Sequence, residues 1–226
     1  MNYATSRQNE KAFANNVFKN FTDVVGGNPD ELSAVLHNKF TVDDFAYSDD
    51  FNYFGYTQYM NKTIIPHKIA VYESGMELLK NPEIDVQLSS QSKEEFIYNL
   101  WIHDLSKFSA DEIFGYANYN RETGSGKLQF EKAWHHHKMH NPHHPEYWLN
   151  PNRSGELEML PIPNIYILEM IADWMGASKT YGSTLAEWMP QNLPKFRFIN
   201  RSKVAELIRD FTGINVKMEE RILIVE

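Results

Sequence analysis

Residues 92–109 read SKEEFIYNLWIHDLSKFS, and this stretch decides the fold that we expect for the chain. Side chains in it recur at spacings of four, three and four, which predicts one face of a helix: Phe96, Leu100, His103 and Lys107. Asp104 falls beside that face. A histidine and a carboxylate next to an apolar face need a partner when they are buried, and a divalent cation suits both.

The composition is that of a globular protein. The chain has 226 residues, of which 42% are hydrophobic and 14% aromatic, enough for a sizeable core. A net charge of −8 speaks against a broad nucleic-acid surface. Because there is no cysteine, any metal must be bound by histidine and carboxylate. No apolar signal core and no run of transmembrane length occurs, so we expect a cytoplasmic protein without a membrane partner.

A helix beginning at Pro66 carries His67 at one end of its inner face. Proline is favoured in the first turn of a helix, and Asn81-Pro82 ends the pattern. The same face narrows to Ser74 and Gly75, small residues that let another helix come close. Taken alone, His67 is either a metal ligand or a core histidine bonded to the backbone.

Most histidines of the chain fall in two short clusters or beside Asp104. Seven of the nine are at positions 103, 135, 136, 137, 140, 143 and 144. Residues 128–140 predict a helix with Trp134 and His137 on its inner face, His136 on its flank and His135 on its outer face. Two further histidines, at 143 and 144, follow the Asn-Pro break directly. This density favours metal binding.

A strongly apolar segment, NIYILEMIADWMGAS at residues 164–178, places two carboxylates on one face. Glu169 and Asp173 are four residues apart, and Gly176 is expected to cap the helix C-terminus. Acidic residues on such an apolar helix are either functional or lie on an exposed edge, and the first reading fits the rest of the pattern better.

The remaining elements frame these helices. Residues 1–24 and 30–40 predict two helices, 41–63 an acidic and aromatic irregular segment, and 202–212 a last helix. Capping boxes are expected where Ser or Thr is followed three residues later by Glu: Ser92, Ser109 and Thr184. The tail ILIVE is either a short strand or an oligomer contact, so a homo-oligomer stays open.

The order of His67, His103-Asp104, the histidine cluster and Asp173 resembles the HD-domain superfamily of all-helical metal-dependent phosphohydrolases. HDLSK is similar to that superfamily's HD-x-x-K form. More narrowly, HDLSKFS, AWHHHKMHNPHHPEYW and EMIADWMGAS resemble a bacterial and phage family of unknown function, over about residues 63–200. The resemblance implies an all-α, HD-like helical bundle at 63–212, which leaves outside it the N-terminal helical and irregular extension at 1–62 and a tail at 213–226. If a phage encodes the protein, the cytoplasm expected above is that of the host.

The same resemblance implies a ligand set. A first metal would be held by His67, His103, Asp104 and Asp173. Asp104 would bridge to a second metal bound by two histidines of the cluster, His137 and His144 foremost, with His136 and His143 as rivals. These two histidines are closer in sequence than in the superfamily. The cofactor would be one or two divalent ions among manganese, iron, zinc, nickel and magnesium.

The expected activity is hydrolysis of a nucleotide or small phosphate ester through metal-activated water. A bound metal lowers the pKa of water from about 15.7 to near 7 and polarises a phosphoryl oxygen. Lys107 would neutralise the phosphate, and Glu169 would orient a ligand or shuttle a proton. Two alternatives remain: an HD-type di-iron oxygenase, separable by iron content and oxygen consumption, and a non-catalytic binding module stabilised by a metal with closed coordination.

Overall fold

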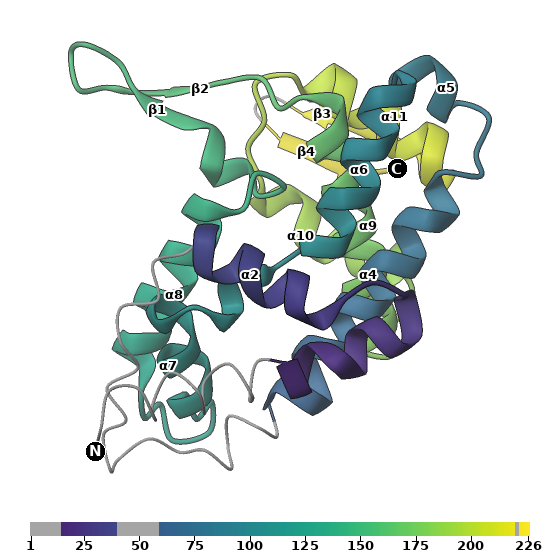
Figure 1. The fold of residues 1–226 in the computed structure, drawn as a ribbon. Coiled ribbons are helices and arrows are strands. Elements are labelled where there is room, and N and C mark those ends of the chain that lie inside the picture. Colours follow the sequence, from purple (N-terminus) through teal and green to yellow (C-terminus); the bar gives the residue numbers. More distant parts are fainter. Residues whose placement is uncertain (1–14, 40–58, 220–221) are drawn as a thin grey trace, which may run out of the picture. The chain divides into compact units, whose positions relative to one another are not determined.

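The computed structural model describes residues 15–39, 59–219 and 222–226 (Figure 1). The predicted all-α class is confirmed, since helices dominate and the described strands form only two short antiparallel pairs. The chain divides into two compact units: Met1–Ile69 with Asp104–His140, and Ala70–His103 with Asn141–Glu226. Most of the acidic and aromatic segment predicted at 41–63 lies outside the described residues. The domain boundaries 1–62, 63–212 and 213–226 stay a prediction.

The first unit is built from short helices that bury both aliphatic and aromatic side chains. Phe18, in the helix at residues 15–25, meets Phe108 with ring centroids 4.8 Å apart. The other described elements of this unit are α2 (Pro29–Lys39), the π-helix η1 (Met60–Ile64), the start of α4 (Ile65–Leu78), the 3-10 helix η2 (Leu105–Phe108), α7 (Ala110–Asn118) and α8 (Lys127–His140).

Helices α7 and α8 approach each other closely at Gly115. A Cβ atom at Gly115 would lie 2.5 Å from the Cβ of Ala133 and 2.5 Å from the carbonyl oxygen of Gln129. Backbone atoms cannot yield as a flexible side chain can, so a residue without a Cβ is required at this position. The absence of that side chain brings the polar groups of α7 within reach of the histidines of α8.

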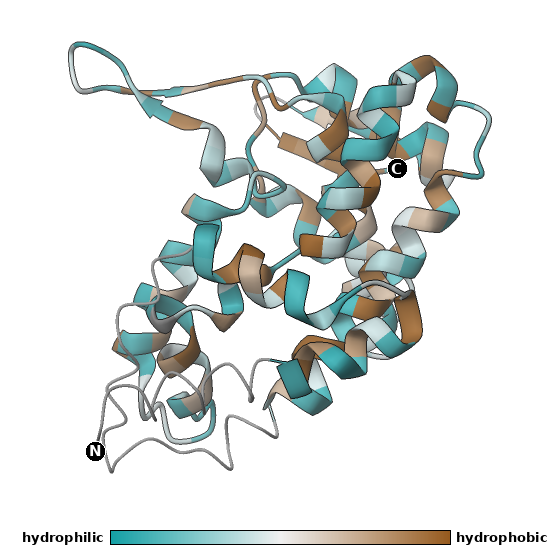
Figure 2. Cartoon of the chain, in the orientation of Figure 1, coloured by the Kyte–Doolittle hydropathy of each residue, from teal (hydrophilic) through white to brown (hydrophobic). Residues whose placement is uncertain are grey.

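The second unit holds a large hydrophobic core, to which α9 (Asn164–Thr180) contributes more buried residues than any other helix. Its other elements are the rest of α4, α5 (Ile84–Gln87), α6 (Ser90–Ile102), η3 (Pro145–Trp148), β1 (Leu149–Pro151), β2 (Leu157–Met159), α10 (Leu185–Asn192), η4 (Leu193–Lys195), α11 (Arg201–Thr212), β3 (Val216–Glu219) and β4 (Ile222–Val225). β4 pairs antiparallel with β3, and Figure 2 draws it as hydrophobic. The tail is therefore a strand, the first of the two alternatives.

Two glycines bring the helices of this core together. A Cβ at Gly75 of α4 would lie 2.3 Å from Cδ1 of Leu100 in α6, which confirms the predicted close approach at the small residues. Gly176 does not cap α9, which continues to Thr180. A Cβ at Gly176 would lie 2.7 Å from the backbone nitrogen of Val71, so this glycine serves helix packing.

The helix that carries the His-Asp pair ends earlier than the spacing predicts. α6 starts after Ser89, whose side chain accepts from the backbone N–H of Ser92, and it stops at Ile102. Asp104 follows with φ 57° and ψ 20°, a left-handed conformation that no right-handed helix can contain. The predicted buried face is confirmed at Phe96 and Leu100, whereas the extension of that helix face to Lys107 was wrong.

Of the other predicted caps, only the one at Thr184 has the expected bonds. Thr184 and Glu187 form a reciprocal capping box at α10. Ser109 precedes α7 without a side-chain cap bond and instead donates to the carbonyl oxygen of Ser106 at 2.6 Å. Among the described residues, no helix is long and apolar enough to cross a membrane.

Candidate metal centre

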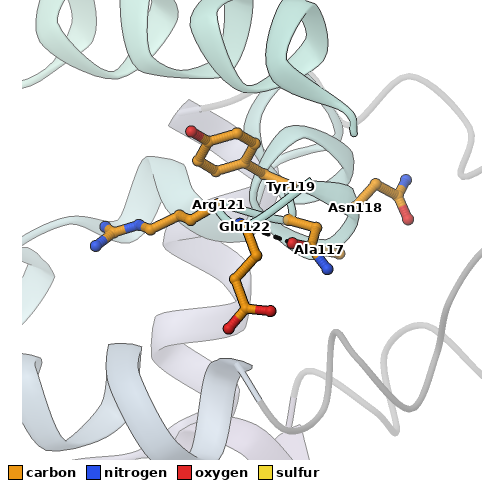
Figure 3. Close-up of a pocket in the computed structure, with 6 residues that line it drawn as sticks. Ala117, Asn118, Tyr119, Arg121 and Glu122 are labelled. Atoms are coloured by element: carbon orange, nitrogen blue, oxygen red, sulfur yellow. Dashed lines mark hydrogen bonds between the residues drawn. The ribbon is translucent and has the colours of Figure 1, made fainter. Parts of the chain in front are cut away.

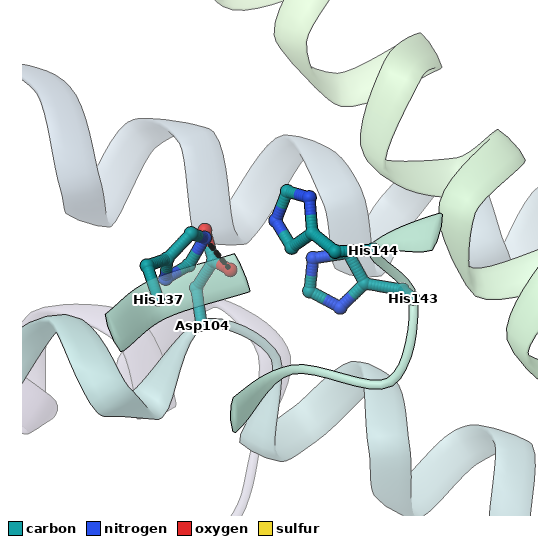
Figure 4. A group of neighbouring side chains, drawn as sticks. All are labelled: Asp104, His137, His143 and His144. Carbon is teal, nitrogen blue, oxygen red and sulfur yellow. Dashed lines mark ion pairs between the residues drawn. The ribbon is translucent and has the colours of Figure 1, made fainter. Parts of the chain in front are cut away.

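In the first unit, the carboxylate of Asp104 lies beside two imidazole rings, one at each oxygen. Nε2 of His67 is 3.6 Å from Oδ2, and Nε2 of His137 is 3.3 Å from Oδ1, the pair that Figure 4 joins by a dashed line. All three side chains are buried. Such spacings are long for hydrogen bonds, but ligand atoms about 2.1 Å from one cation lie about 3.0 to 3.4 Å apart. The rings are thus spaced nearly as ligands of a cation are.

Lys107 supplies the positive charge beside this carboxylate. Its ammonium group donates to Oδ2 of Asp104 across one turn of η2. Burial lowers the pKa of Lys107, but the Asp104 carboxylate, together with Tyr116 and Tyr59, holds that pKa well above its usual value. Lys107 is therefore charged, and it neutralises Asp104 in this structure. Its predicted contact with a phosphate stays a prediction.

Glu112 of α7 is a buried acceptor for two adjacent histidines of α8. Its Oε1 is 2.8 Å from Nδ1 of His136, and its Oε2 is 3.1 Å from Nδ1 of His137. Burial raises the pKa of Glu112, but the hydrogen bonds from both histidines hold it below its usual value. Because an ionised carboxylate only accepts, both rings donate from Nδ1 and keep Nε2 for other contacts.

In the second unit, Glu169 of α9 is a buried acceptor for two other histidines. Its Oε1 is 3.0 Å from Nδ1 of His103 and 3.2 Å from Nδ1 of His143. Burial raises the pKa of Glu169, yet these two contacts lower it to about 2. The opposite nitrogen of His103, Nε2, is 3.6 Å from Oδ1 of Asp173. The ring of His144 lies beside that of His143, with centroids 4.4 Å apart and the planes tilted by 42° (Figure 4).

Three imidazoles, those of His136, His137 and His103, turn Nδ1 toward a buried glutamate and Nε2 toward an aspartate. The Nδ1 contacts are 2.8 to 3.2 Å long, as hydrogen bonds are, and the Nε2 spacings are 3.3 to 3.6 Å. His103, His143 and Glu169 offer ligand atoms within 4.8 Å of one another. Neutral imidazole nitrogens and carboxylate oxygens fit a transition-metal ion, and burial lowers the pKa of His137, which favours its neutral form.

Two other histidines of α8 lie further out. His136 is partly exposed, with Nε2 3.5 Å from Oδ2 of Asp111, and its pKa is raised by the hydrogen bond to Glu112. His135 is exposed, as predicted. Trp134 was expected on the inner face but is 39% exposed, with its ring stacked on that of His137.

His135→Ala is expected to leave metal content and melting temperature unchanged, because an exposed side chain of α8 contributes little to stability. His137→Ala, two residues along the same helix, is the matched variant and should lose metal. Elemental analysis of both purified proteins checks this. Loss of metal in His135→Ala would show that the assigned facing of α8 is incorrect.

An open pocket of about 550 Å³ lies at the turn after α7 (Figure 3). Backbone and polar side chains of residues 117–122 line it, with Arg121 and Glu122 at its sides. It contains none of the candidate ligands, so it does not mark a substrate site beside them.

The described chain is thus a mainly helical protein with buried histidine and carboxylate groups that could hold a metal ion. It belongs to a family of unknown function, DUF5662, whose model matches residues 56–221. No curated protein and no solved structure matches the chain. Membership of the HD-domain superfamily therefore stays a prediction from the motifs.

Sequence reasoning identified the histidines and Asp104 but missed Glu112. The spacing from Ser109 to Glu112 is that of a capping box, so Glu112 was interpreted as a capping residue and not as a partner of the histidines. A signal was present, since Glu112 is one turn before Tyr116, another inward-facing side chain of α7.

Proposed function

We propose that this protein is a metal-dependent phosphohydrolase acting on a nucleotide or another small phosphate ester. The observation that carries the proposal is the Asp104 carboxylate, with one imidazole Nε2 at each of its oxygens. A carboxylate that offers one oxygen to each of two cations is a common bridge in two-metal phosphate chemistry.

The proposed ligands follow the HD resemblance. One cation would be bound by His67, His103, Asp104 and Asp173, and a second by Asp104, His137 and one of the neighbouring pair at 143 and 144. Support comes from the direction of Nε2 in His67, His103 and His137, each of which points at an aspartate. When bound, such ions would activate water and polarise a phosphoryl oxygen.

Protein side chains have separate tasks in this proposal. Lys107 holds Asp104 in place through its ammonium group and brings positive charge to where a phosphoryl group would bind. Glu169 keeps the rings of His103 and His143 turned so that Nε2 is available. Both contacts are made by Oε1, and they favour the first of the two tasks predicted for Glu169, the orientation of ligands.

The test combines elemental analysis of the purified chain with a screen of nucleotides and phosphate esters. We expect one or two transition-metal ions per chain, and phosphate release that stops on chelation and returns with added metal. A metal-free preparation of unchanged stability would contradict the proposal. Iron with substrate-dependent oxygen consumption and no phosphate release would favour the oxygenase alternative. Bound metal with neither activity would favour the binding module.

A further inference from the structure

We infer that Glu112 is a positioning residue: it anchors the ring of His136 and fixes the tautomer of His137, so that Nε2 of His137 faces Asp104. This inference deepens the proposed function, on which it rests for its metal-binding measurement alone. The tautomer of His137 is a property of the metal-free chain and is measured separately.

The geometry begins with two consecutive residues on α8. Side chains of neighbouring helical residues diverge by about 100°, yet Nδ1 of both His136 and His137 reaches one carboxylate, each at its own oxygen. Glu112 can stand between them because α7 and α8 come close at Gly115, one turn further along. Both oxygens of Glu112 are thereby used.

The tautomer follows from the chemistry of the acceptor. A carboxylate has no proton to donate, so each ring nitrogen that meets it must carry the hydrogen. In a neutral imidazole the other nitrogen then keeps its lone pair, which is the form that binds a cation. Nε2 of His137, 3.3 Å from Asp104, is that nitrogen.

A capping role does not account for Glu112. Ser109 makes no side-chain cap bond to α7, and Glu112 is completely buried, whereas a capping glutamate reaches back to an exposed helix end. The hydroxyl of Ser106, 3.2 Å from Nδ1 of His137, lies in the same contact, and its hydrogen bond to Glu112 helps to hold the pKa of that carboxyl below its usual value. Glu112 therefore accepts hydrogen bonds from side chains of both α8 and η2.

The experiment removes His136, so that Glu112 accepts a hydrogen bond from only one ring, that of His137. In the His136→Ala background, Gln at position 112 still offers one acceptor oxygen to His137, while Leu offers none. We expect metal affinity within about threefold of wild type for His136→Ala and for E112Q/H136A. For E112L/H136A we expect a loss of about 10- to 100-fold. Gln and Leu have similar volume, so a difference between these two variants reports the hydrogen bond to His137 and not the filling of space.

Nitrogen-15 NMR of histidine-labelled, metal-free protein reads the tautomer directly. We expect His137 to carry its proton on Nδ1 in wild type and in E112Q/H136A, and to lose this preference in E112L/H136A. If that variant does not fold, E112Q alone replaces it, because two rings then compete for one acceptor and one of them must move its proton to Nε2. Unchanged tautomers in E112L/H136A or E112Q, or loss of metal in His136→Ala, would overturn the inference. Absent phosphate release with the expected tautomers would contradict only the proposed function.

Discussion

Asp104→Asn is expected to remove bound metal and to lower metal-dependent activity by at least about 100-fold, beyond the range typical of residues that only support a ligand. Asparagine tolerates the left-handed backbone at position 104, so the turn after α6 should persist. Its neutral amide, however, cannot neutralise a cation, and it leaves the largely buried ammonium group of Lys107 without a carboxylate. Elemental analysis and activity measurements on the purified variant check the expectation.

Stability provides an internal control for this variant. Breaking a buried ion pair from one side costs about 3–5 kcal/mol, and removing both charges in D104N/K107M should recover much of it without restoring metal. Asp23→Asn is the matched control, because Asp23 pairs with Lys19 on the exposed surface, where an ion pair contributes about 1 kcal/mol or less. Metal retained in Asp104→Asn would show that Asp104 is not a ligand.

Glu169→Leu is expected to destabilise the protein by about 3–6 kcal/mol, since two hydrogen bonds to a charged acceptor are lost at about 1.5–3 kcal/mol each. Metal affinity should fall by about 10- to 100-fold, because His103 and His143 lose the contact that orients them. Urea unfolding and metal titration provide the two measurements.

Glu169→Gln should be much milder than Glu169→Leu. Both histidines contact the same oxygen, Oε1, and one amide oxygen can replace it. Glu94→Leu, at an exposed position of α6, is the control for the leucine itself and should change stability by about 0.5 kcal/mol or less. If Gln were as damaging as Leu, the charge of Glu169 and not its acceptor geometry would be what matters.

The sequence predicted those parts of the fold that depend on local spacing. The helices of α2, α8 and α11 start and end within one or two residues of the expected positions, because periodicity and flanking breakers are local signals. The capping box at Thr184 and the strand β4 also follow from local sequence signals. The exposed position of His135 follows from helical geometry alone.

What could not be predicted depends on contacts distant in sequence. The left-handed conformation of Asp104 ends α6 before His103, although the side-chain spacing continues to Lys107. The role of Glu112 depends on a partner helix 24 residues away, so its spacing from Ser109 gave the wrong reading. Gly176 likewise serves a contact with Val71 that only the folded core creates.

The turn that joins α7 to α8 has a practical consequence. The two helices meet at Gly115 and through Glu112, whereas residues 121–125 are exposed and hydrogen-bond within the turn. Insertions in that turn should therefore leave the candidate ligands undisturbed. A fluorescent label or an affinity tag placed there would report on the intact protein without competing for its histidines.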